Sequence, residues 1–365
     1  MPRLSRRQML STSAGLGMYT LTSGYVSADD QTESSQSKLR PEPNRAGAEL
    51  ITPDTNRAIQ RALTYMARKQ ITSGRGAGCF GTSGYASGVA VCSLAGLGFM
   101  SAGSAPDEGR YSKYVDRCID FIVASTQESG FISPVGHSND QMYGHGLATL
   151  FLAEVYGMTE NKEVGDKLRR AVKLICTCQN DDGGWRYQPV KSSADLSITI
   201  CQIMALRAAR DAGLHVPIEV RNKCMEYVKR CHTSEGCFQY TLKGGRKSVA
   251  LTAAGVVSLY SAGVYEGPVI DSAIAWLKKH PLATNTSRST AGRNYYYAMY
   301  YSSQAMWQIG DDTWKDWYTA MRDKLLREQA TDGSWTDASI GAEFGTAIGL
   351  IVLNTPNNYL PVFAN

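Results

Sequence analysis

The chain has 365 residues, of which 43% are hydrophobic and 19% are charged, a composition typical of a globular protein that can bury a large core. The formal net charge of +5 includes three arginines and no acid from the first 28 residues, so the remainder has 35 basic residues against 33 acidic ones. This near balance argues against nucleic-acid binding, and beyond those 28 residues no run of about 18 apolar residues predicts a transmembrane span.

Residues 1–28 are predicted to be an export signal. Residues 5–10, SRRQML, resemble the twin-arginine consensus, the segment after them is mildly apolar, and small residues at 26–28 fit a cleavage site. The mature protein is therefore expected to be periplasmic or secreted. Residues 29–49 are polar and contain proline, which predicts a disordered linker.

One pattern recurs six times between residues 50 and 355. Five copies have a small residue and, three positions later, a large side chain; the sixth, with Met321 and Lys324, is degenerate. Most copies continue with Gln or a substitute and a Gly-rich turn. The large residues are Tyr65, Phe121, Leu174, Tyr227, Trp276 and Lys324, spaced by 56, 53, 53, 49 and 48 residues. The turns end at Phe80, Phe131, Trp185, Phe238 and Trp335, and the fifth copy, at residues 285–297, lacks the turn. Such a period indicates stacked supersecondary units.

The third copy predicts the structure of one unit. Leu168, Ala171 and Ile175 lie on one face of a helix whose other face is charged, and the turn NDDGG ends it. A second helix, from about Leu196 to Gly213, is apolar on almost every face and is expected to be buried. The repeated pair predicts an all-α fold of six helical hairpins, with six inner helices around a cavity and six outer helices covering them.

Six such units could stack either as a closed ring or as an open solenoid. An open solenoid would need polar capping repeats at both ends. Here the inner helices of the terminal copies, at residues 89–100 and 344–353, are apolar. We therefore expect the two ends of the array to meet and close the ring.

The repeat turns resemble those of a known superfamily. QNDDGGW at 179–185 and QATDGSW at 329–335 are similar to the repeat turns of terpenoid cyclases and protein prenyltransferase β subunits. GGWRYQPVKSSADLS at 183–197 also resembles the Gly-Gly-aromatic stretch before an inner helix of the prenyltransferases. The resemblance implies an (α/α)6 toroid with two concentric helix rings over residues 50–355, followed by a C-terminal tail at 356–365. Because these turns are structural in that superfamily, the resemblance specifies the fold rather than an activity.

The catalytic signatures of that superfamily are missing from the sequence. Squalene-type cyclases use a D-x-D-D acid, and no Asp cluster here has that spacing. In the prenyltransferase zinc site, Asp195 would match the aspartate, but Ser197 replaces the cysteine and His145 comes from the preceding repeat. We therefore predict no metal and no cofactor. An N-capping role explains Asp195 more simply.

The starts of the inner helices are expected to gather at one mouth of the ring and to form the site. The predicted ligand-binding residues are Tyr143, Tyr297, Tyr300, Tyr301 and Gln304, the last four on one helix face. The candidate catalytic residues are His145, Asp195 and Glu343. One common pocket is expected to be lined by at least four of Tyr297, Tyr300, Tyr301, Gln304, His145 and Asp195. The alternative is that the tyrosines pack between helices, with their hydroxyls bonded to backbone carbonyls.

Two classes of function stay open. The first is a binding protein that holds an apolar or carbohydrate ligand in the central cavity; the sequence identifies no partner protein. The second is a divergent enzyme, either a prenyl- or terpenoid-handling transferase or cyclase, or an (α/α)6 lyase or glycosidase. The enzyme would use His145, tyrosines and a pair of carboxylates drawn from Asp140, Asp195, Asp337 and Glu343. Whether these side chains converge in the cavity or are buried between helices distinguishes the two classes.

All nine cysteines follow the predicted signal, where an oxidising compartment would allow disulfides. Cys231 and Cys237 flank a short turn and are the best local candidates for a pair.

Overall fold

The computed structural model describes residues 47–361, apart from residues 83, 135–140 and 283–293. The described residues belong to one unit, Asn44–Ala364. The predicted export signal, residues 29–46 of the predicted linker, residues 285–293 of the fifth copy and the candidate carboxylate Asp140 lie outside the described residues.

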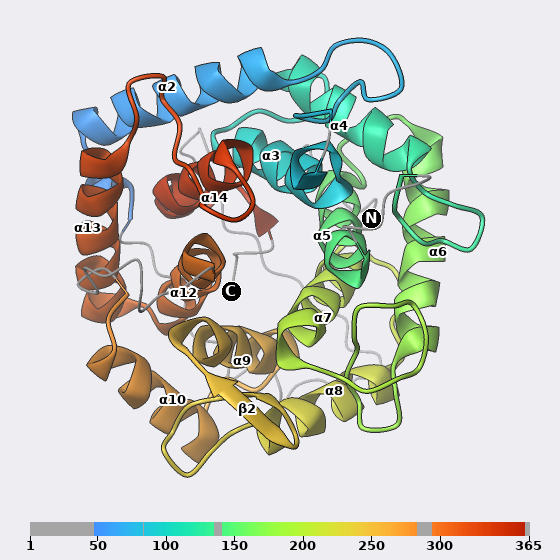
Figure 1. The fold of residues 1–365 in the computed structure, drawn as a ribbon, viewed down its shortest axis with the longest axis vertical. Helices are drawn as coiled ribbons and strands as arrows, with labels where there is room; N and C mark the ends of the chain where they lie inside the picture. Colours follow the sequence, from blue (N-terminus) through green and yellow to red (C-terminus); the bar gives the residue numbers. More distant parts are fainter. Residues whose placement is uncertain (1–46, 83, 135–140, 283–293, 362–365) are drawn as a thin grey trace, which may run out of the picture. The chain divides into compact units, whose positions relative to one another are not determined.

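The described residues contain twelve α-helices, arranged as two concentric rings (Figure 1). The outer ring consists of α2 (Pro53–Lys69), α4 (Ser112–Ala124), α6 (Lys162–Cys178), α8 (Ile218–Arg230), α10 (Pro268–Lys279) and α13 (Asp311–Glu328). The inner ring consists of α3 (Val89–Ser101), α5 (Gln141–Val155), α7 (Leu196–Asp211), α9 (Val249–Ser261), α12 (Tyr295–Ile309) and α14 (Ala342–Asn354). The predicted toroid of six helical hairpins is confirmed.

The two rings differ in how apolar residues are distributed around each helix. In α6, Leu168, Ala171 and Ile175 are buried on one face while its charged residues face solvent. In α14, by contrast, every residue from Phe344 to Asn354 is buried. A helix that is apolar on all faces must be covered on all sides, so α14 and its counterparts form the inner ring.

A glutamine in each well-formed turn joins one repeat to the next. The amide of Gln179 donates to the carbonyl of Gly183 in its own turn (2.9 Å) and to that of Val220 in the next outer helix (2.8 Å). Gln329 donates in the same way to Gly333 (2.9 Å) and to Ala58 of α2 (2.9 Å). The same pair of hydrogen bonds therefore links the third repeat to the fourth and the sixth repeat to the first. The predicted closed ring is confirmed.

The aromatic residue of the turn wedges between the two helices of its repeat. Trp185 is buried and its indole N–H donates to the carbonyl of Ile175 (2.8 Å), and Trp335 makes the equivalent bond to Leu325 (2.9 Å). In the second repeat the wedge is Ile132, which is fully buried, whereas Phe131 is only partly buried. The prediction that this turn ends at Phe131 is therefore wrong by one residue: the wedge follows the turn glycine by two positions.

The fourth repeat adds a short β-hairpin to the all-α fold. Between α8 and α9, strand β1 (Gln239–Thr241) pairs antiparallel with β2 (Gly244–Lys247), the single named sheet in the described residues. The glycines of this segment explain the turn, because Gly244 and Gly245 have φ values of +105° and +110°, which side chains disfavour. This hairpin projects over the end of the ring near α9 (Figure 1).

The two ends of the described segment are packed onto the ring. Ala48–Leu50 forms a short 3₁₀ helix, and Arg322 donates to the carbonyl of Leu50 (2.8 Å). Residues 48 and 49, which the sequence assigned to the end of a disordered linker, lie in this 3₁₀ helix. In the predicted tail, Pro356 and Leu360 are buried.

All nine cysteines are described and all are free thiols. Cys231 and Cys237, the best local candidates for a disulfide, are therefore not paired: both side chains are buried, and the Cys237 thiol lies 3.3 Å from the Thr233 hydroxyl. Among the described helices, none is long and apolar enough to cross a membrane.

Candidate functional site

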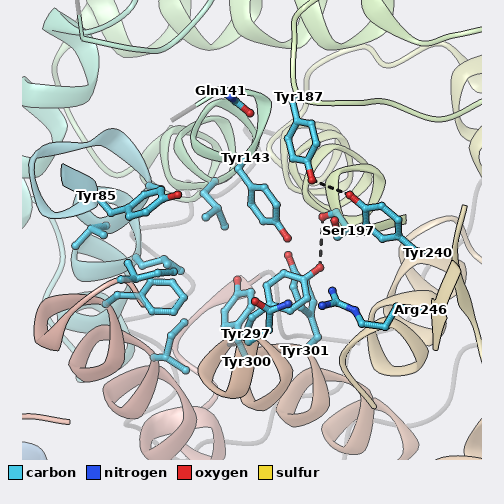
Figure 2. Close-up of a pocket in the computed structure, with 18 residues that line it drawn as sticks. Tyr85, Gln141, Tyr143, Tyr187, Ser197, Tyr240, Arg246, Tyr297, Tyr300 and Tyr301 are labelled. Carbon is cyan, nitrogen blue, oxygen red and sulfur yellow. Dashed lines mark hydrogen bonds between the residues drawn. The ribbon is translucent and has the colours of Figure 1, made fainter. Parts of the chain in front are cut away.

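A cavity of about 610 Å³ opens at one mouth of the inner ring (Figure 2). It is lined by the first two turns of the inner helices α3, α5, α12 and α14, by the start of α7 and by the β-hairpin. Seven tyrosines contribute to the lining: Tyr85, Tyr143, Tyr187, Tyr240, Tyr297, Tyr300 and Tyr301. This volume is in the usual range for a small-molecule site.

The two sides of the cavity differ in polarity. The side formed by α3 and α14 is apolar and includes Val91, Leu94 and Ile348. The opposite side, formed by α7, α12 and the hairpin, has hydroxyl groups and the guanidinium of Arg246 (Figure 2). The cavity therefore suits a ligand that is apolar along one side and polar on another.

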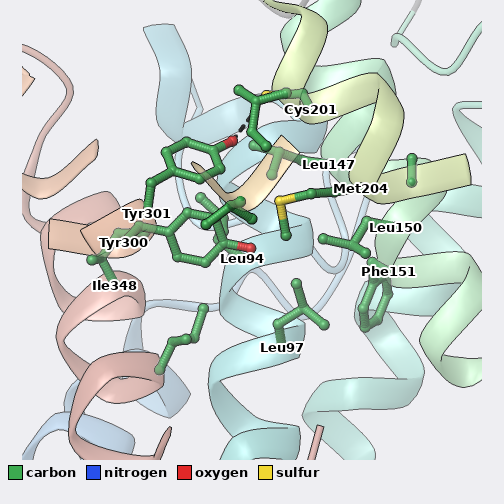
Figure 3. Packing of buried hydrophobic residues seen from close by; sticks show 14 of the residues in the cluster. Leu94, Leu97, Leu147, Leu150, Phe151, Cys201, Met204, Tyr300, Tyr301 and Ile348 are labelled. Carbon is green, nitrogen blue, oxygen red and sulfur yellow. Dashed lines mark hydrogen bonds between the residues drawn. The ribbon is translucent and has the colours of Figure 1, made fainter. Parts of the chain in front are cut away.

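The centre of the ring is filled beneath the cavity. Leu97 and Leu150 lie one helical turn below the lining residues Leu94 and Leu147, and both are buried. Met204 of α7 packs against the same group (Figure 3). The cavity is therefore a blind pocket with an apolar floor.

The tyrosines of α5 and α12 form an edge-to-face cluster. The ring centroids of Tyr297 and Tyr301 are 4.7 Å apart at 67°, and those of Tyr143 and Tyr297 are 5.9 Å apart at 71°. The Tyr297 hydroxyl donates to the carbonyl of Ser197 (3.3 Å), and the Tyr301 hydroxyl lies 3.2 Å from the Cys201 thiol. Burial raises the pKa of the Tyr143, Tyr297 and Tyr301 hydroxyls well above their usual range, so they stay protonated.

A second group of aromatic and cationic side chains lies at the mouth. The hydroxyls of Tyr187 and Tyr240 are 2.7 Å apart. The guanidinium of Arg186 lies 5.4 Å from the Tyr187 ring and 5.9 Å from the Tyr240 ring, and its Nε is 3.9 Å from Asp195 Oδ2. This group holds the rim of the cavity together.

The structure places the predicted ligand-binding residues as follows. Tyr143, Tyr297, Tyr300 and Tyr301 line the cavity, whereas Gln304 does not. Gln304 is buried one turn deeper in α12, where its amide donates to the Tyr300 carbonyl (3.3 Å). Gln304 shares a helix face with the tyrosines but lies below the cavity, because the pocket is only about two helical turns deep.

None of the three candidate catalytic residues lines the cavity. Asp195 caps α7: its Oδ1 accepts from the backbone N–H of Ile198 (2.9 Å) and from the Ser197 hydroxyl (2.6 Å), as the alternative reading of the sequence expected. Glu343 faces α2, where it accepts from the Tyr65 hydroxyl (3.1 Å).

His145 is a structural residue of the second repeat. Its Nδ1 accepts the backbone N–H of the wedge residue Ile132 (3.2 Å). In the third repeat the hydroxyl of Thr199 accepts the N–H of Trp185 in the same way (3.2 Å), and Thr252 and Thr346 do so in the fourth and sixth repeats. His145 thus occupies a position that threonine fills elsewhere.

Three of the six side chains expected to share one pocket do so, so the prediction of at least four is wrong. Helix geometry gives the reason. His145 follows Tyr143 by two residues, which rotates it about 200° around α5, away from the cavity. The described residues also contain no group of three His, Cys, Asp or Glu side chains placed to hold a metal ion.

We expect His145 to make the fold sensitive to acid. Burial lowers the pKa of its imidazole to about 3, against a smaller opposing effect of the Ala171 carbonyl. The unfolded chain titrates near pH 6.5 and so binds more protons between pH 6.5 and 3, which means that stability falls as pH drops through this window. Between about pH 7 and about pH 4.5, the free energy of unfolding measured in urea should fall by roughly 2.5 kcal/mol because of this residue.

The matched variant for that titration is His145→Thr, which supplies the acceptor found in the other repeats and has no group that titrates in this range. Its free energy of unfolding should depend less steeply on pH than that of the wild-type protein. Equal slopes for the two proteins would show that the imidazole is protonated in the folded state.

Four lining residues at the mouth were not predicted from the sequence: Tyr85, Tyr187, Tyr240 and Arg246. For the last two a signal was present. Residues 239–247, QYTLKGGRK, place Gly-Gly inside a short alternating segment, which is typical of a hairpin turn. Tyr85 and Tyr187 lie in irregular segments, for which the repeat pattern gives no position.

Comparisons with known proteins agree with this architecture. The family model of the prenyltransferase alpha-alpha toroid domain matches residues 145–284. No curated protein matches the chain. A variant of the type II terpene cyclase MstE from Scytonema, solved in complex with geranylgeranyl dihydroxybenzoate, is 15% identical with a TM-score of 0.58, over 84% of this chain and 98% of that one.

Two similar structures come from proteins named for sugar chemistry. Cellobiose 2-epimerase from Bacillus thermoamylovorans has a TM-score of 0.59 at 11% identity, over 83% of this chain and 99% of that one. An alpha-amylase from Clostridium perfringens has a TM-score of 0.58 at 11% identity, over 81% and 97%. Together the family match and the fold confirm the resemblance to the toroids of terpenoid cyclases and prenyltransferases; at such low identity the solved structures show the fold alone.

Proposed function

We propose that this toroid is a binding protein that holds an elongated apolar ligand in its tyrosine-lined cavity. The observation that carries the proposal is the composition of that lining. It combines aliphatic side chains and aromatic rings in a blind pocket of about 610 Å³, and among the described lining residues none has a carboxylate, an imidazole or a thiol. Such a pocket favours burial of apolar surface over acid–base chemistry.

The same lining favours an apolar ligand over a carbohydrate. A sugar needs a hydrogen-bonding partner for most of its hydroxyls, since unpaired polar groups are costly to bury. Here several tyrosine hydroxyls already have partners: Tyr297 bonds to the Ser197 carbonyl, and Tyr187 bonds to Tyr240. The MstE complex with geranylgeranyl dihydroxybenzoate shows that a toroid of this kind can hold a ligand with a long apolar chain, which supports the same choice.

The enzyme alternative is less well supported by the positions of its candidate groups. Protonation of an alkene or hydrolysis of a glycoside requires an acid within reach of the ligand. Asp195 caps α7, Glu343 bonds to Tyr65, and His145 accepts the Ile132 N–H. Asp337 is likewise engaged in its own turn, where Oδ1 accepts the N–H groups of Ser339 (2.8 Å) and Ile340 (2.9 Å).

Export is part of the proposal. It is supported by the twin-arginine-like segment at residues 5–10 and by small residues at the expected cleavage site. A periplasmic or secreted toroid would then meet its ligand outside the cytoplasm.

Blocking the cavity tests the binding role. Ala90 lines the pocket near the start of α3 and is half-buried. Ala90→Phe adds a ring inside the pocket and should weaken binding of geranylgeraniol about tenfold or more, because overfilling a packed site costs about 1–3 kcal/mol. Intrinsic tyrosine and tryptophan fluorescence can follow the titration.

Ala90→Ser is the matched control, because it changes the same position with almost no added volume and should keep the wild-type affinity. Native mass spectrometry of the purified protein gives an independent readout through any apolar ligand that it retains. Wild-type protein that binds no long-chain apolar probe would contradict the proposed function.

A further inference from the structure

One tyrosine hydroxyl at the deep end of the cavity has no hydrogen-bond partner. Tyr300 lines the cavity from the second turn of α12 and is 2% exposed. Among the described residues, none lies within hydrogen-bonding distance of its hydroxyl oxygen. A buried hydroxyl without a partner is uncommon and lowers stability, since it has lost its bonds to water. A phenylalanine ring would fill the same space without this loss.

The two tyrosines beside Tyr300 in the cavity wall differ from it, because their hydroxyls have partners in the protein. The Tyr297 hydroxyl donates to the carbonyl of Ser197 (3.3 Å), and the Tyr301 hydroxyl lies 3.2 Å from the Cys201 thiol. All three tyrosines come from the first two turns of α12. Of the three, Tyr300 is therefore the one that is placed to bind a ligand oxygen.

The side chain of Gln304 does not satisfy this hydroxyl. It lies one helical turn deeper, where its Nε2 donates to the carbonyl of Tyr300 (3.3 Å) and its Oε1 accepts from no group in the described part of the chain. Burial raises the pKa of the Tyr300 hydroxyl above its usual range, and the smaller opposing effect of Gln304 is that of a hydrogen-bond donor. A donor leaves the hydrogen of the hydroxyl unused, so Tyr300 is still able to donate one hydrogen bond.

The floor of the cavity beneath this hydroxyl is apolar. Figure 3 shows the ring of Tyr300 directed toward the side of the cavity formed by Leu150 and Met204, both of which are buried. An ionised ligand group would lose its hydration here and gain no countercharge from these side chains. Besides burial, the carboxylate of Glu154 adds to the raised pKa of Tyr300, and its negative charge would likewise oppose an anion at this point. An uncharged oxygen, such as that of a ketone, an ether or an alcohol, is the acceptor that suits the floor.

We propose that the ligand is an apolar molecule with an uncharged oxygen at the end that enters the cavity first, and that the Tyr300 hydroxyl donates a hydrogen bond to this oxygen. This inference rests on the proposed binding function and specifies the ligand class. The apolar body of the ligand lies against α3 and α14, where the lining residues Leu94 and Ile348 are aliphatic. Because the hydroxyl gives up no partner in the protein, the new bond favours the ligand that carries the oxygen.

Two probes of the same shape test the proposal. One is geranylgeranylacetone, which has a ketone at one end, and the other is its isostere in which a methylidene group replaces the carbonyl oxygen. Each is titrated into wild-type protein and into Tyr300→Phe, which keeps the ring and removes the hydroxyl. The ketone should bind Tyr300→Phe about three- to tenfold more weakly than wild type, the usual effect of a hydrogen bond between neutral groups, and the isostere should bind both proteins equally. Fluorescence titration of the full chain gives the dissociation constants.

Unfolding without ligand shows whether the hydroxyl is already paired inside the protein. Tyr318 of α13 provides the matched control, because it is also buried, lies outside the cavity lining and donates to the carbonyl of Leu353 (2.9 Å). Tyr318→Phe should lower the urea concentration at the midpoint of unfolding, since it removes the donor from a buried carbonyl. Tyr300→Phe should keep or raise that midpoint. Tyr318→Phe should also keep the wild-type ratio of the two dissociation constants.

The outcomes separate this inference from the proposed function. If Tyr300→Phe weakens both probes equally or neither of them, the hydroxyl does not bind a ligand oxygen and the binding function stands. The same conclusion follows if Tyr300→Phe lowers the unfolding midpoint as much as Tyr318→Phe does, because the hydroxyl would then have a partner inside the protein. If wild-type protein binds neither probe, the proposed function itself fails.

Discussion

Trp185→Ala is expected to lower the free energy of unfolding by about 3–5 kcal/mol, the usual cost of removing a large aromatic side chain from a core. Trp185 is 2% exposed and wedges between α6 and α7, and its indole N–H donates to the carbonyl of Ile175 (2.8 Å). The substitution leaves a cavity and also removes the donor from a buried carbonyl. Urea unfolding followed by circular dichroism measures the loss.

Two further variants test this explanation of the loss in stability. Trp185→Phe keeps most of the ring and removes the indole donor, so it should cost about 1–2 kcal/mol. Tyr359→Ala removes an aromatic side chain that is 47% exposed and should change stability by less than about 0.5 kcal/mol. A loss below about 1 kcal/mol for Trp185→Ala would show that the ring is not a buried wedge.

Gly183→Ala should lower stability by a comparable amount, although it adds a single methyl group. Gly183 has a φ of +97°, and a Cβ built there would lie 2.1 Å from the carbonyl oxygen of Lys223 in α8. The left-handed backbone costs roughly 1–2 kcal/mol for a residue with a side chain, and the clash with fixed backbone adds roughly 1–3 kcal/mol. We therefore expect a total loss of about 2–5 kcal/mol, measured by urea unfolding.

Gly213→Ala is the matched control for backbone conformation. Gly213 has a φ of +93°, but nothing lies within 4 Å of an added Cβ. Its substitution should cost only the conformational part, about 1–2 kcal/mol. Equal losses at the two positions would mean that contact between the third repeat turn and α8 contributes nothing to stability.

The repeat pattern alone determined the fold. Helical spacing in the outer helices, apolar inner helices and a period near fifty residues are local properties of the sequence, and each repeat must bury its inner helix against its neighbours. Ring closure was also predictable, because the apolar residues 344–353 needed cover that an open end would not give. The hydrogen bond from Gln329 to the Ala58 carbonyl, which links the sixth repeat to the first, was seen only in the structure.

The sequence predicted which tyrosines line the cavity, but it did not predict where the candidate titratable groups lie. Tyr297, Tyr300 and Tyr301 begin an inner helix and line the cavity. His145 and Asp195 also lie near inner-helix starts, yet one accepts a turn N–H and the other caps α7. Each of these roles depends on the direction of the side chain around the helix and on which donor lies beside it, and neither follows from sequence spacing.

The sequence by itself thus determined the toroid, and it predicted the tyrosines that line the cavity at one mouth of the ring. Only the tertiary structure decided the polarity of the mouth, because Tyr240 and Arg246 reach the cavity from a hairpin far from α3 and α14 in the sequence. Only the tertiary structure, too, showed His145 in the position of a threonine. Periodicity along a chain specifies which faces are buried, whereas the partners of a buried polar group are set by contacts between repeats.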